Sequence, residues 1–295
     1  MNDIKIMVSR HSAFYSPLIC TIAGGFLEKE GLEGLYHVVE AGGSSGGAVA
    51  EGRMDVAQAA VSASWGPLDQ GRKPSFAHFA QINRYDGFFI AARQPDADFS
   101  WDKLGSGKFL HVHGGQPEAM LRYGAFNQGL DLSEVDDIDS IGGSEMMAQW
   151  RNGEGDYFHE QGAFPQQLEH DGQGFIVASV GEAVGPVAFS SMACRWDWQK
   201  TDDGKRFTAA YRASREWVNA ADPAKIAKAE GSFFPEMAEN AIASAVAFYQ
   251  TLGTWDGGIA IEPDLYSTAL DVFEHSKLVG SRHPYDEVVV QPCDD

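Results

Sequence analysis

The chain repeats one local pattern, in which a short apolar strand leads through a loop of small or polar residues into an amphipathic helix. In the first copy, apolar residues alternate over residues 4–8, as a half-buried strand requires. The helix that follows has Ser16 at its expected N-cap, Pro17 in its first turn and Gly31 at the left-handed position after its last turn. Strands that alternate with helices predict an α/β fold with mixed, mostly parallel sheets.

Further copies of the pattern follow the first along the chain. Their strands are predicted at residues 35–39, 54–61, 109–113 and 138–141. The third helix begins near Pro117 and ends at Gly129, and the next has Ser144 as its N-cap and Gly153 after its last turn. Because one plan of strand, loop and helix appears in two separate sets, we predict two α/β lobes.

Two apolar segments, residues 87–92 and 187–193, lead out of the first and the second set of units. If each crosses between the lobes as a hinge strand, residues 94–186 form an inserted lobe II. Residues 1–93 and 187–295 together then form lobe I. A chain of 295 residues is longer than most single domains, which agrees with this division.

The composition excludes several classes of partner and site. Lys and Arg number 22 against 42 Asp and Glu, so the chain is acidic, with a formal net charge of −20. This charge repels phosphate backbones and anionic lipids, so we expect neither nucleic acid nor membrane as a partner. No apolar run approaches the ~20 residues of a membrane span. Cys20, Cys194 and Cys293 are too far apart for a disulfide framework or a structural zinc site, and we expect two buried thiols and one tail thiol.

The start of the chain leaves the compartment open. Met1 is followed directly by Asn2, Asp3 and the first strand, without the basic and apolar regions of a signal peptide. We expect a periplasmic location if a leader has been removed and a cytoplasmic one if Met1 is the native start. For the oligomeric state we expect a monomer or a weak dimer.

Five segments of the chain resemble, in the same order, the solute-binding proteins for nitrate, sulfonates and taurine and the related thiamine-pyrimidine precursor synthases. They are SPLICTIAGGFLEKEGL, GGAVAEGRMDVAQA, GGQPEAMLRYGAFNQGLDLSEVD, NGEGDYFHEQGAFPQQLEHDG and YRASREWV. The resemblance covers nearly the whole chain. It implies the type 2 periplasmic-binding fold, in which two α/β lobes joined by two hinge strands close over a small-molecule ligand. It also implies an ABC permease as a partner.

The synthase branch of this family uses a lysine and a histidine just after the third strand and a cysteine-rich iron motif after the second hinge. In this chain the first region reads VAQAAVSASW and contains neither residue. The second region reads PVAFSSMACRWDW and holds a single cysteine, Cys194. The resemblance therefore does not extend to the synthase chemistry, and we expect no cofactor.

Loops at the carboxyl ends of strands, and the helix N-termini that follow them, line ligand sites in open α/β sheets. The candidate ligand-binding residues in these loops are His11, Ser12, Phe14, Tyr15, Gly43, Ser44, Ser45, Ser62, Ser64, Trp65, Gly114, Gly115 and Gln116. Glu160 joins them because it matches a stretch in which relatives place a ligand-contacting acid. Alternatives stay open: Phe14 packs inward, Ser44 only caps a helix, or Trp65 belongs to the core instead of stacking on a flat ligand.

The sequence holds few residues in metal-binding or catalytic patterns. His111 and His113 alternate on one strand and share a face, but two ligands are too few, so we expect no metal site. Asp136, Asp137 and Asp139 are interpreted as a solvated edge. GxSxG, HExxH and GxxxxGK[ST] motifs are absent from the sequence, which gives no support to serine-elbow, zincin or P-loop chemistry.

The leading functional hypothesis is a binding protein that closes over a small polar or aromatic molecule. It requires Tyr15, Ser45, Trp65 and Gln116 to meet in one crevice between the lobes. The alternative is a cytosolic enzyme on the same fold, such as a lyase, a decarboxylase or a thiamine-precursor enzyme, with His11 as its acid–base group. A third hypothesis, a ligand-sensing subunit that docks on a partner, has no positive feature in the sequence.

Overall fold

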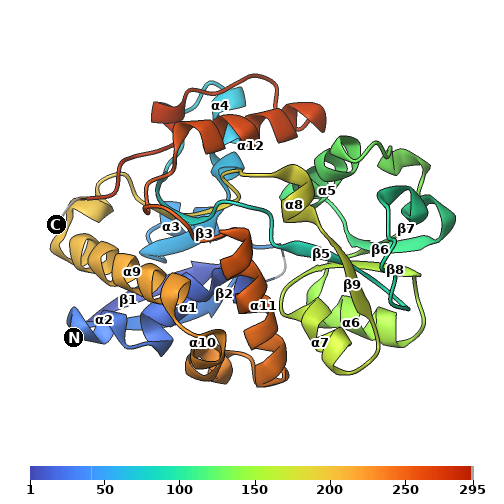
Figure 1. Cartoon of the computed structure of the whole chain (residues 1–295). Helices are drawn as coiled ribbons and strands as arrows, with labels where there is room; N and C mark the ends of the chain where they lie inside the picture. Colours follow the sequence, from blue (N-terminus) through green and yellow to red (C-terminus); the bar gives the residue numbers. More distant parts are fainter. Residues whose placement is uncertain (41, 294–295) are drawn as a thin grey trace.

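The computed structural model describes residues 1–40 and 42–293 and contains two mixed five-stranded sheets, each flanked by helices (Figure 1). We call the part built on the first sheet the first lobe and the part built on the second sheet the second lobe. The expected two-lobed α/β fold is confirmed. In Figure 1 the second lobe is the green part on the right.

The first sheet has the strand order β2-β1-β3-β10-β4. Its strands are β1 (Asn2–Val8), β2 (Leu32–Val38), β3 (Val56–Ala59), β4 (Ala77–Asn83) and β10 (Ser190–Cys194). Strand β1 runs parallel to both β2 and β3, whereas β10 is antiparallel to β3 and β4. The carboxyl ends of β1 and β3 therefore meet the start of β10 at one edge of the sheet.

The second sheet has the order β7-β6-β8-β5-β9. Its strands are β5 (Phe88–Ala92), β6 (Lys108–Val112), β7 (Asp136–Ser140), β8 (Tyr157–Gln161) and β9 (Phe175–Ser179). Strand β6 is parallel to β7 and β8, and β5 is antiparallel to β8 and β9. Because β5 pairs within this sheet, the sheet begins before the lobe boundary predicted at residue 93, and that boundary stays a prediction.

The chain passes between the sheets twice, from β4 to β5 and from β9 to β10. These two connections lie side by side and are hydrogen-bonded to each other. The Val187 amide donates to the Arg84 carbonyl at 2.9 Å, and the Phe189 amide donates to the Asn83 carbonyl at 3.2 Å. The hinge strands predicted at residues 87–92 and 187–193 largely coincide with β5 of the second sheet and β10 of the first, and the connections themselves lie just before these strands.

Helices cover both sheets. Those of the first lobe are α1 (Ser16–Ala23), α2 (Phe26–Lys29), α3 (Ser45–Ala50), α4 (Trp65–Asp69), α9 (Asp202–Ala220), α10 (Pro223–Glu230), α11 (Glu239–Leu252) and α12 (Pro263–His275). Those of the second lobe are α5 (Gly115–Asn127), α6 (Gly143–Arg151), α7 (Phe164–His170) and α8 (Val180–Val184). The 3-10 turns are η1 (Ala13–Tyr15), η2 (Val61–Ser64), η3 (Trp101–Ser106), η4 (Leu132–Glu134), η5 (Trp198–Lys200), η6 (Gly231–Phe233) and η7 (Tyr285–Glu287).

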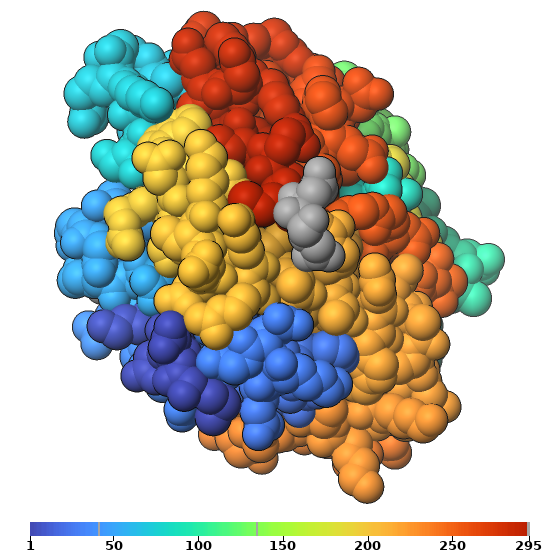
Figure 2. Space-filling view, turned by 90° about the vertical axis from the view of Figure 1, so that its left-hand side faces the viewer, coloured from blue at the N-terminus to red at the C-terminus, as the bar shows by residue number. Residues whose placement is uncertain are grey.

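The C-terminal third of the chain completes the first lobe. Helix α9 packs against α1 and α2, and α11 packs both on α10 and on α7 of the second lobe. Figure 2 shows the N-terminal segments and the later C-terminal segments sharing one continuous face of the molecule. Among the described residues, no helix is long and apolar enough to span a bilayer.

Several predicted element ends are wrong by a few residues. Ser16 is the first residue of α1 and Tyr15 is its N-cap, because the loop first forms the turn η1, which the Ser12 hydroxyl caps. Gly142 is the N-cap of α6, so Ser144 lies inside the first turn of that helix. The single helix predicted between Ser16 and Gly31 is divided into α1 and α2, because Gly25 between them has a φ of 70°. Gly31, after α2, has the expected positive φ, 71°. Cys20 and Cys194 are buried and Cys293 is half-buried, as predicted.

Candidate functional site

A cavity of about 220 Å³, which we call the cleft cavity, lies where the two lobes meet. The first lobe contributes lining residues from the ends of β1 and β3 and the start of β10, namely Ser9, Arg10, Tyr15, Gln58, Ala60, Phe189 and Ser190. The second lobe contributes Gln116 and Pro117 from the first turn of α5 and Gln161 from the end of β8. Because strand ends and a helix start converge there from both lobes, closure would enclose whatever lies between them.

Polar side chains of the first lobe form a connected row along the cavity. The Ser9 hydroxyl donates to Gln58 Oε1 at 2.6 Å, and the Ser9 amide donates to the same oxygen at 3.0 Å. Gln58 Nε2 in turn donates to the Ser190 hydroxyl at 3.0 Å. Gln58 lies in the middle of a fully buried strand, where an amide without hydrogen bonds would be destabilising. These bonds satisfy the amide and fix its orientation.

Gln116 enters the cavity from the second lobe. Its Nε2 donates to the Phe189 carbonyl at 2.7 Å, and its Oε1 lies 3.4 Å from the Ser62 hydroxyl. Gly114 and Gly115 precede it with φ of 76° and 62°, a backbone shape that favours glycine. These two glycines therefore set the angle at which Gln116 reaches the first lobe.

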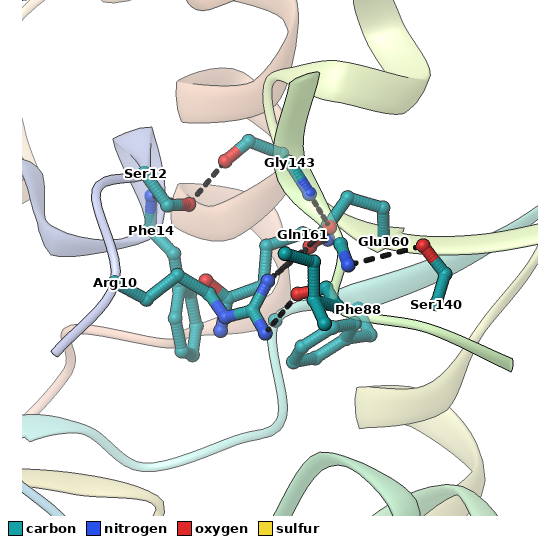
Figure 3. Close-up of polar contacts among 12 residues, drawn as sticks. Arg10, Ser12, Phe14, Phe88, Ser140, Gly143, Glu160 and Gln161 are labelled. Carbon is teal, nitrogen blue, oxygen red and sulfur yellow. Dashed lines mark hydrogen bonds and ion pairs between the residues drawn. The ribbon is translucent and has the colours of Figure 1, made fainter. Parts of the chain in front are cut away.

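An ion pair joins the lobes beside the cleft cavity (Figure 3). Arg10 Nη1 donates to both carboxylate oxygens of Glu160, at 3.1 and 3.2 Å, and its guanidinium carbon lies 5.6 Å from the centre of the Phe88 ring. The Glu160 carboxylate also accepts bonds from the amides of Gly143 and Gln161. Its side chain is fully buried, whereas that of Arg10 is 23% exposed. Four N–H contacts thus compensate the desolvation of a buried carboxylate.

Gly142 makes this arrangement possible. Its φ is 85°, and a Cβ at this position would collide with the Glu160 carboxylate and with the Arg10 guanidinium. The turn before α6 therefore passes directly against the ion pair, and only glycine fits there.

A second inter-lobe contact lies behind the first. The Ser12 hydroxyl donates to the Gly162 carbonyl. The Gly162 amide donates to the Tyr249 hydroxyl at 2.9 Å, and that hydroxyl donates to the Gly87 carbonyl at 2.7 Å. Ser12 and helix α11 therefore help to hold the lobes together.

Of the predicted residues of the first loop, the structure places Tyr15 at the cleft cavity. Its hydroxyl accepts a bond from Gln161 Nε2 at 3.4 Å. Burial raises the pKa of Tyr15, so its phenol stays protonated. Phe14 is completely buried and packs on Phe189 and Tyr249, which is the inward alternative considered for it.

His11 lies in a separate cavity of about 310 Å³, formed with helices α6 and α7 and the segment after η6. Its Nδ1 lies 2.9 Å from the Tyr36 hydroxyl and its Nε2 lies 2.8 Å from the Phe233 carbonyl. The ring also stacks on Phe234 with 4.5 Å between centroids. Burial lowers the pKa of His11, so the imidazole is held neutral with both nitrogens occupied.

Of the remaining predicted residues, some contact the residues that line the cleft cavity and others are part of the core or the surface. Ser45 donates to the Gln58 carbonyl at 3.0 Å, behind the cleft cavity, and Ser62 contacts Gln116. Ser44 caps α3 on the exposed side of the same helix start, beside the exposed Gly43. Ser64 is buried and its hydroxyl lies 3.1 Å from His78 Nε2.

Trp65 lies away from the cleft cavity. It is 2% exposed, donates from Nε1 to the Tyr266 hydroxyl at 3.0 Å, and packs edge-on against Phe273. Of the four residues expected to share a crevice, Tyr15 and Gln116 line the cleft cavity, Ser45 stands behind Gln58, and Trp65 belongs to the core. The physical reason is that η2 turns the chain back into α4 before the indole can reach the cleft.

Sequence reasoning missed the residues that supply most of the cavity's polar groups: Ser9, Arg10, Gln58, Gln161 and Ser190. For two of these residues the sequence did contain a local indication. Gln58 interrupts the apolar strand VAQA, and a polar side chain inside a buried strand calls for a specific partner. Arg10 is a cation next to the first loop of a strongly acidic chain.

The chain is similar in sequence to one curated protein of at least comparable length. No family model matches the chain. A Bacillus subtilis (strain 168) protein described as "Putative binding protein YtlA" is 24% identical over 293 residues, which cover 98% of this chain and 88% of that protein.

Solved structures of ABC-type binding proteins superpose on nearly the whole chain. The alkanesulfonate-binding protein SsuA from Xanthomonas axonopodis pv. citri, bound to MOPS, has a TM-score of 0.75 at 12% identity, covering 99% of each chain. A zinc-bound ligand-binding component of an ABC-type import system from Staphylococcus aureus has a TM-score of 0.76 at 14% identity, covering 99% of this chain and 97% of that one. The nitrate-binding protein NrtA from Synechocystis PCC 6803 has a TM-score of 0.70 at 14% identity, covering 97% and 84%. The fold is thus that of the periplasmic binding proteins, as the sequence resemblance implied.

Proposed function

We propose that this chain is a solute-binding protein that closes its two lobes over a small polar or aromatic organic molecule in the cleft cavity. The observation that carries the proposal is the convergence of hydrogen-bonding side chains from both lobes on one cavity. The similarity to binding components of ABC import systems supports it. By the same similarity, we propose an ABC permease as the partner that receives the solute.

The chemistry of the cavity favours a compact ligand with several polar atoms. Its volume of about 220 Å³ is below the ~300–1,000 Å³ typical of drug-sized ligands. Gln58, Gln116 and Gln161 each carry both donor and acceptor atoms, and the buried phenol of Tyr15 adds another. The Arg10 cation is neutralised by Glu160, so the walls offer hydrogen bonds more than net charge. Compounds similar to sulfonates or thiamine precursors, with a flat or tetrahedral polar group, fit this description.

The alternative of a cytosolic enzyme depended on His11 as an acid–base group. A general base needs a ring nitrogen free to reach a substrate within hydrogen-bond distance. Both nitrogens of His11 already face protein partners, Tyr36 and Phe233, and the ring lies outside the cleft cavity. The geometry therefore favours binding over catalysis at His11.

Isothermal titration calorimetry of the full chain against sulfonates, aromatic carboxylates, pyrimidines and polyamines tests the proposal. We expect one of these classes to bind at a single site with a Kd of about 1 µM or tighter. Gln116→Ala removes an amide from the cavity and is expected to weaken that binding about 10-fold, the worth of one hydrogen bond.

The matched control is Gln128→Ala, at the exposed carboxyl end of the same helix. It should leave the affinity unchanged. Flat titrations for all four classes, or equal losses in the two variants, would count against a ligand site at the cleft cavity.

A further inference from the structure

A cluster of metal-ligating side chains lies on one face of two neighbouring strands, outside the cleft cavity. His111 and His113 belong to β6 and its following residue, and Asp137 and Asp139 belong to β7. Strands β6 and β7 pair in parallel, with His111 opposite Asp139. The alternation of each strand puts both histidines and both aspartates on one face of the sheet. One ligand atom from each of the four residues lies within 4.8 Å of all the others.

The two close pairs within the cluster stand at hydrogen-bond distance, slightly nearer to each other than two ligands of one cation. His111 Nε2 is 3.0 Å from Asp137 Oδ2, and His113 Nδ1 is 2.8 Å from Asp139 Oδ1. Four nitrogen and oxygen ligands at ~2.0–2.2 Å from one cation stand roughly 3.3–3.5 Å apart in a tetrahedron. His113, Asp137 and Asp139 are 45–66% exposed, so small rotations of their side chains reach that spacing.

The second nitrogen of His111 has a partner at hydrogen-bond distance, and that of His113 lies near a carboxylate. His111 Nδ1 lies 3.2 Å from the Val112 carbonyl, and His113 Nε2 lies 3.7 Å from a carboxylate oxygen of Glu118. A neutral His111 ring has one N–H for two facing acceptors. If Nδ1 carries the proton and donates to the Val112 carbonyl, the lone pair of Nε2 faces the Asp137 carboxylate. A cation bound by both Nε2 and this carboxylate would then remove the contact between two acceptors. A carbonyl or carboxylate behind a ligating histidine is the arrangement that usually orients such ligands.

We propose that His111, His113, Asp137 and Asp139 form a binding site for a divalent transition-metal cation of the zinc type. Two imidazoles favour Zn²⁺, Co²⁺, Ni²⁺ or Cu²⁺ over Mg²⁺ and Ca²⁺, which prefer oxygen ligands. Two carboxylates balance the double charge of the cation. The sequence prediction of no metal site counted only the two histidines of one strand, because the two acids come from the neighbouring strand 26 residues further on.

The position of the cluster gives the bound cation a structural consequence. Strand β7 is the edge of the second sheet and is tied to the rest of that sheet through β6. His113 directly precedes the two positive-φ glycines that lead to Gln116. A cation held by all four residues would fasten β7 to β6 and stiffen the turn from which α5 enters the cleft. The proposal does not depend on the function proposed above, since it concerns a different face.

The test is calorimetry of the tag-free full chain, treated with chelator and titrated with ZnCl₂, with CoCl₂ absorption spectra as the second readout. We expect one equivalent of Zn²⁺, a Co²⁺ spectrum of a four-coordinate nitrogen and oxygen site, and a higher melting temperature with Zn²⁺. MgCl₂ at the same concentration should give no heat. His113→Asn and Asp139→Asn change half-exposed or exposed residues, so both variants should fold, and each should weaken Zn²⁺ binding at least 10-fold.

Asp136→Asn is the matched control, because Asp136 is exposed on the same strand but its side chain points to the opposite face. It removes the same charge and should change the Zn²⁺ affinity less than 2-fold. The proposal is overturned if the wild-type chain binds no Zn²⁺. It is equally overturned if binding persists in His113→Asn and Asp139→Asn, or if Asp136→Asn lowers the affinity as much as they do.

Discussion

Removing the Arg10 cation should destabilise the chain more than removing other surface cations. Arg10→Met leaves the fully buried Glu160 carboxylate with only the amides of Gly143 and Gln161 as donors. Breaking a buried ion pair from one side costs about 3–5 kcal/mol. Arg10 is 23% exposed and two amide donors remain, so we expect a loss of about 2–3 kcal/mol in the free energy of unfolding.

The reverse change should cost less. Glu160→Gln keeps the size of the side chain and leaves Arg10, which can turn toward water. The new NH2 group cannot accept the bond from one of the amides of Gly143 and Gln161, so we expect a loss of about 1–2 kcal/mol. The double variant removes both charges and leaves no buried ion unpaired. Its loss should therefore be smaller than the sum of the two single losses by about 1–2 kcal/mol.

The assay is urea unfolding at pH 7, followed by circular dichroism for the wild type, both single variants and the double variant. Arg84→Met is the matched control. Arg84 is 22% exposed, but its partner Glu262 is 49% exposed and lies at 3.5 Å, so this pair should be worth at most about 1 kcal/mol. Strictly additive losses, or an Arg10→Met loss no larger than that of Arg84→Met, would refute the reasoning.

Two further predictions concern the first lobe. Burial raises the pKa of Glu230 to about 8, although hydrogen bonds from Ser16 and Cys20 oppose the shift. Because the folded chain then holds a proton that the unfolded chain releases near pH 4.5, stability should fall as pH rises from about 4.5 to about 8, by an amount on the order of 5 kcal/mol. Glu230→Gln should flatten this pH profile in urea titrations, and an unchanged profile would contradict the assignment. Trp65→Phe loses the bond to Tyr266 and some core packing, so we expect about 1–2 kcal/mol less stability and an unchanged solute affinity, whereas a weaker affinity would return Trp65 to the cleft.

The order of helices and strands could be predicted well from the sequence, because each element depends on a short-range pattern of residues. Alternating apolar residues placed β1, and the positive φ of Gly31 and Gly129 ended helices where the sequence indicated. The helix starts predicted at Ser16 and Ser144 are wrong because the turn η1 leads directly into α1, and because Gly142 takes the N-cap position of α6.

The candidate site could be predicted only in part, because it depends on which side chains meet across the fold. Gln116 was found from its position after two glycines at a helix start. The partnership of Arg10 with Glu160 spans 150 residues, and nothing local to either residue indicates it. Trp65 was expected at the cleft because it follows a strand end, but a residue in that position can still point into the core.

The paired connections between the lobes limit how the molecule can move. Two backbone segments joined by amide–carbonyl bonds at Val187 and Phe189 resist shear and twist more than they resist bending. The lobes should consequently rotate about one axis through these two segments. The direction of closure would then be the same for every solute. Selectivity would therefore depend on which polar atoms a solute presents to the cavity walls as the lobes close.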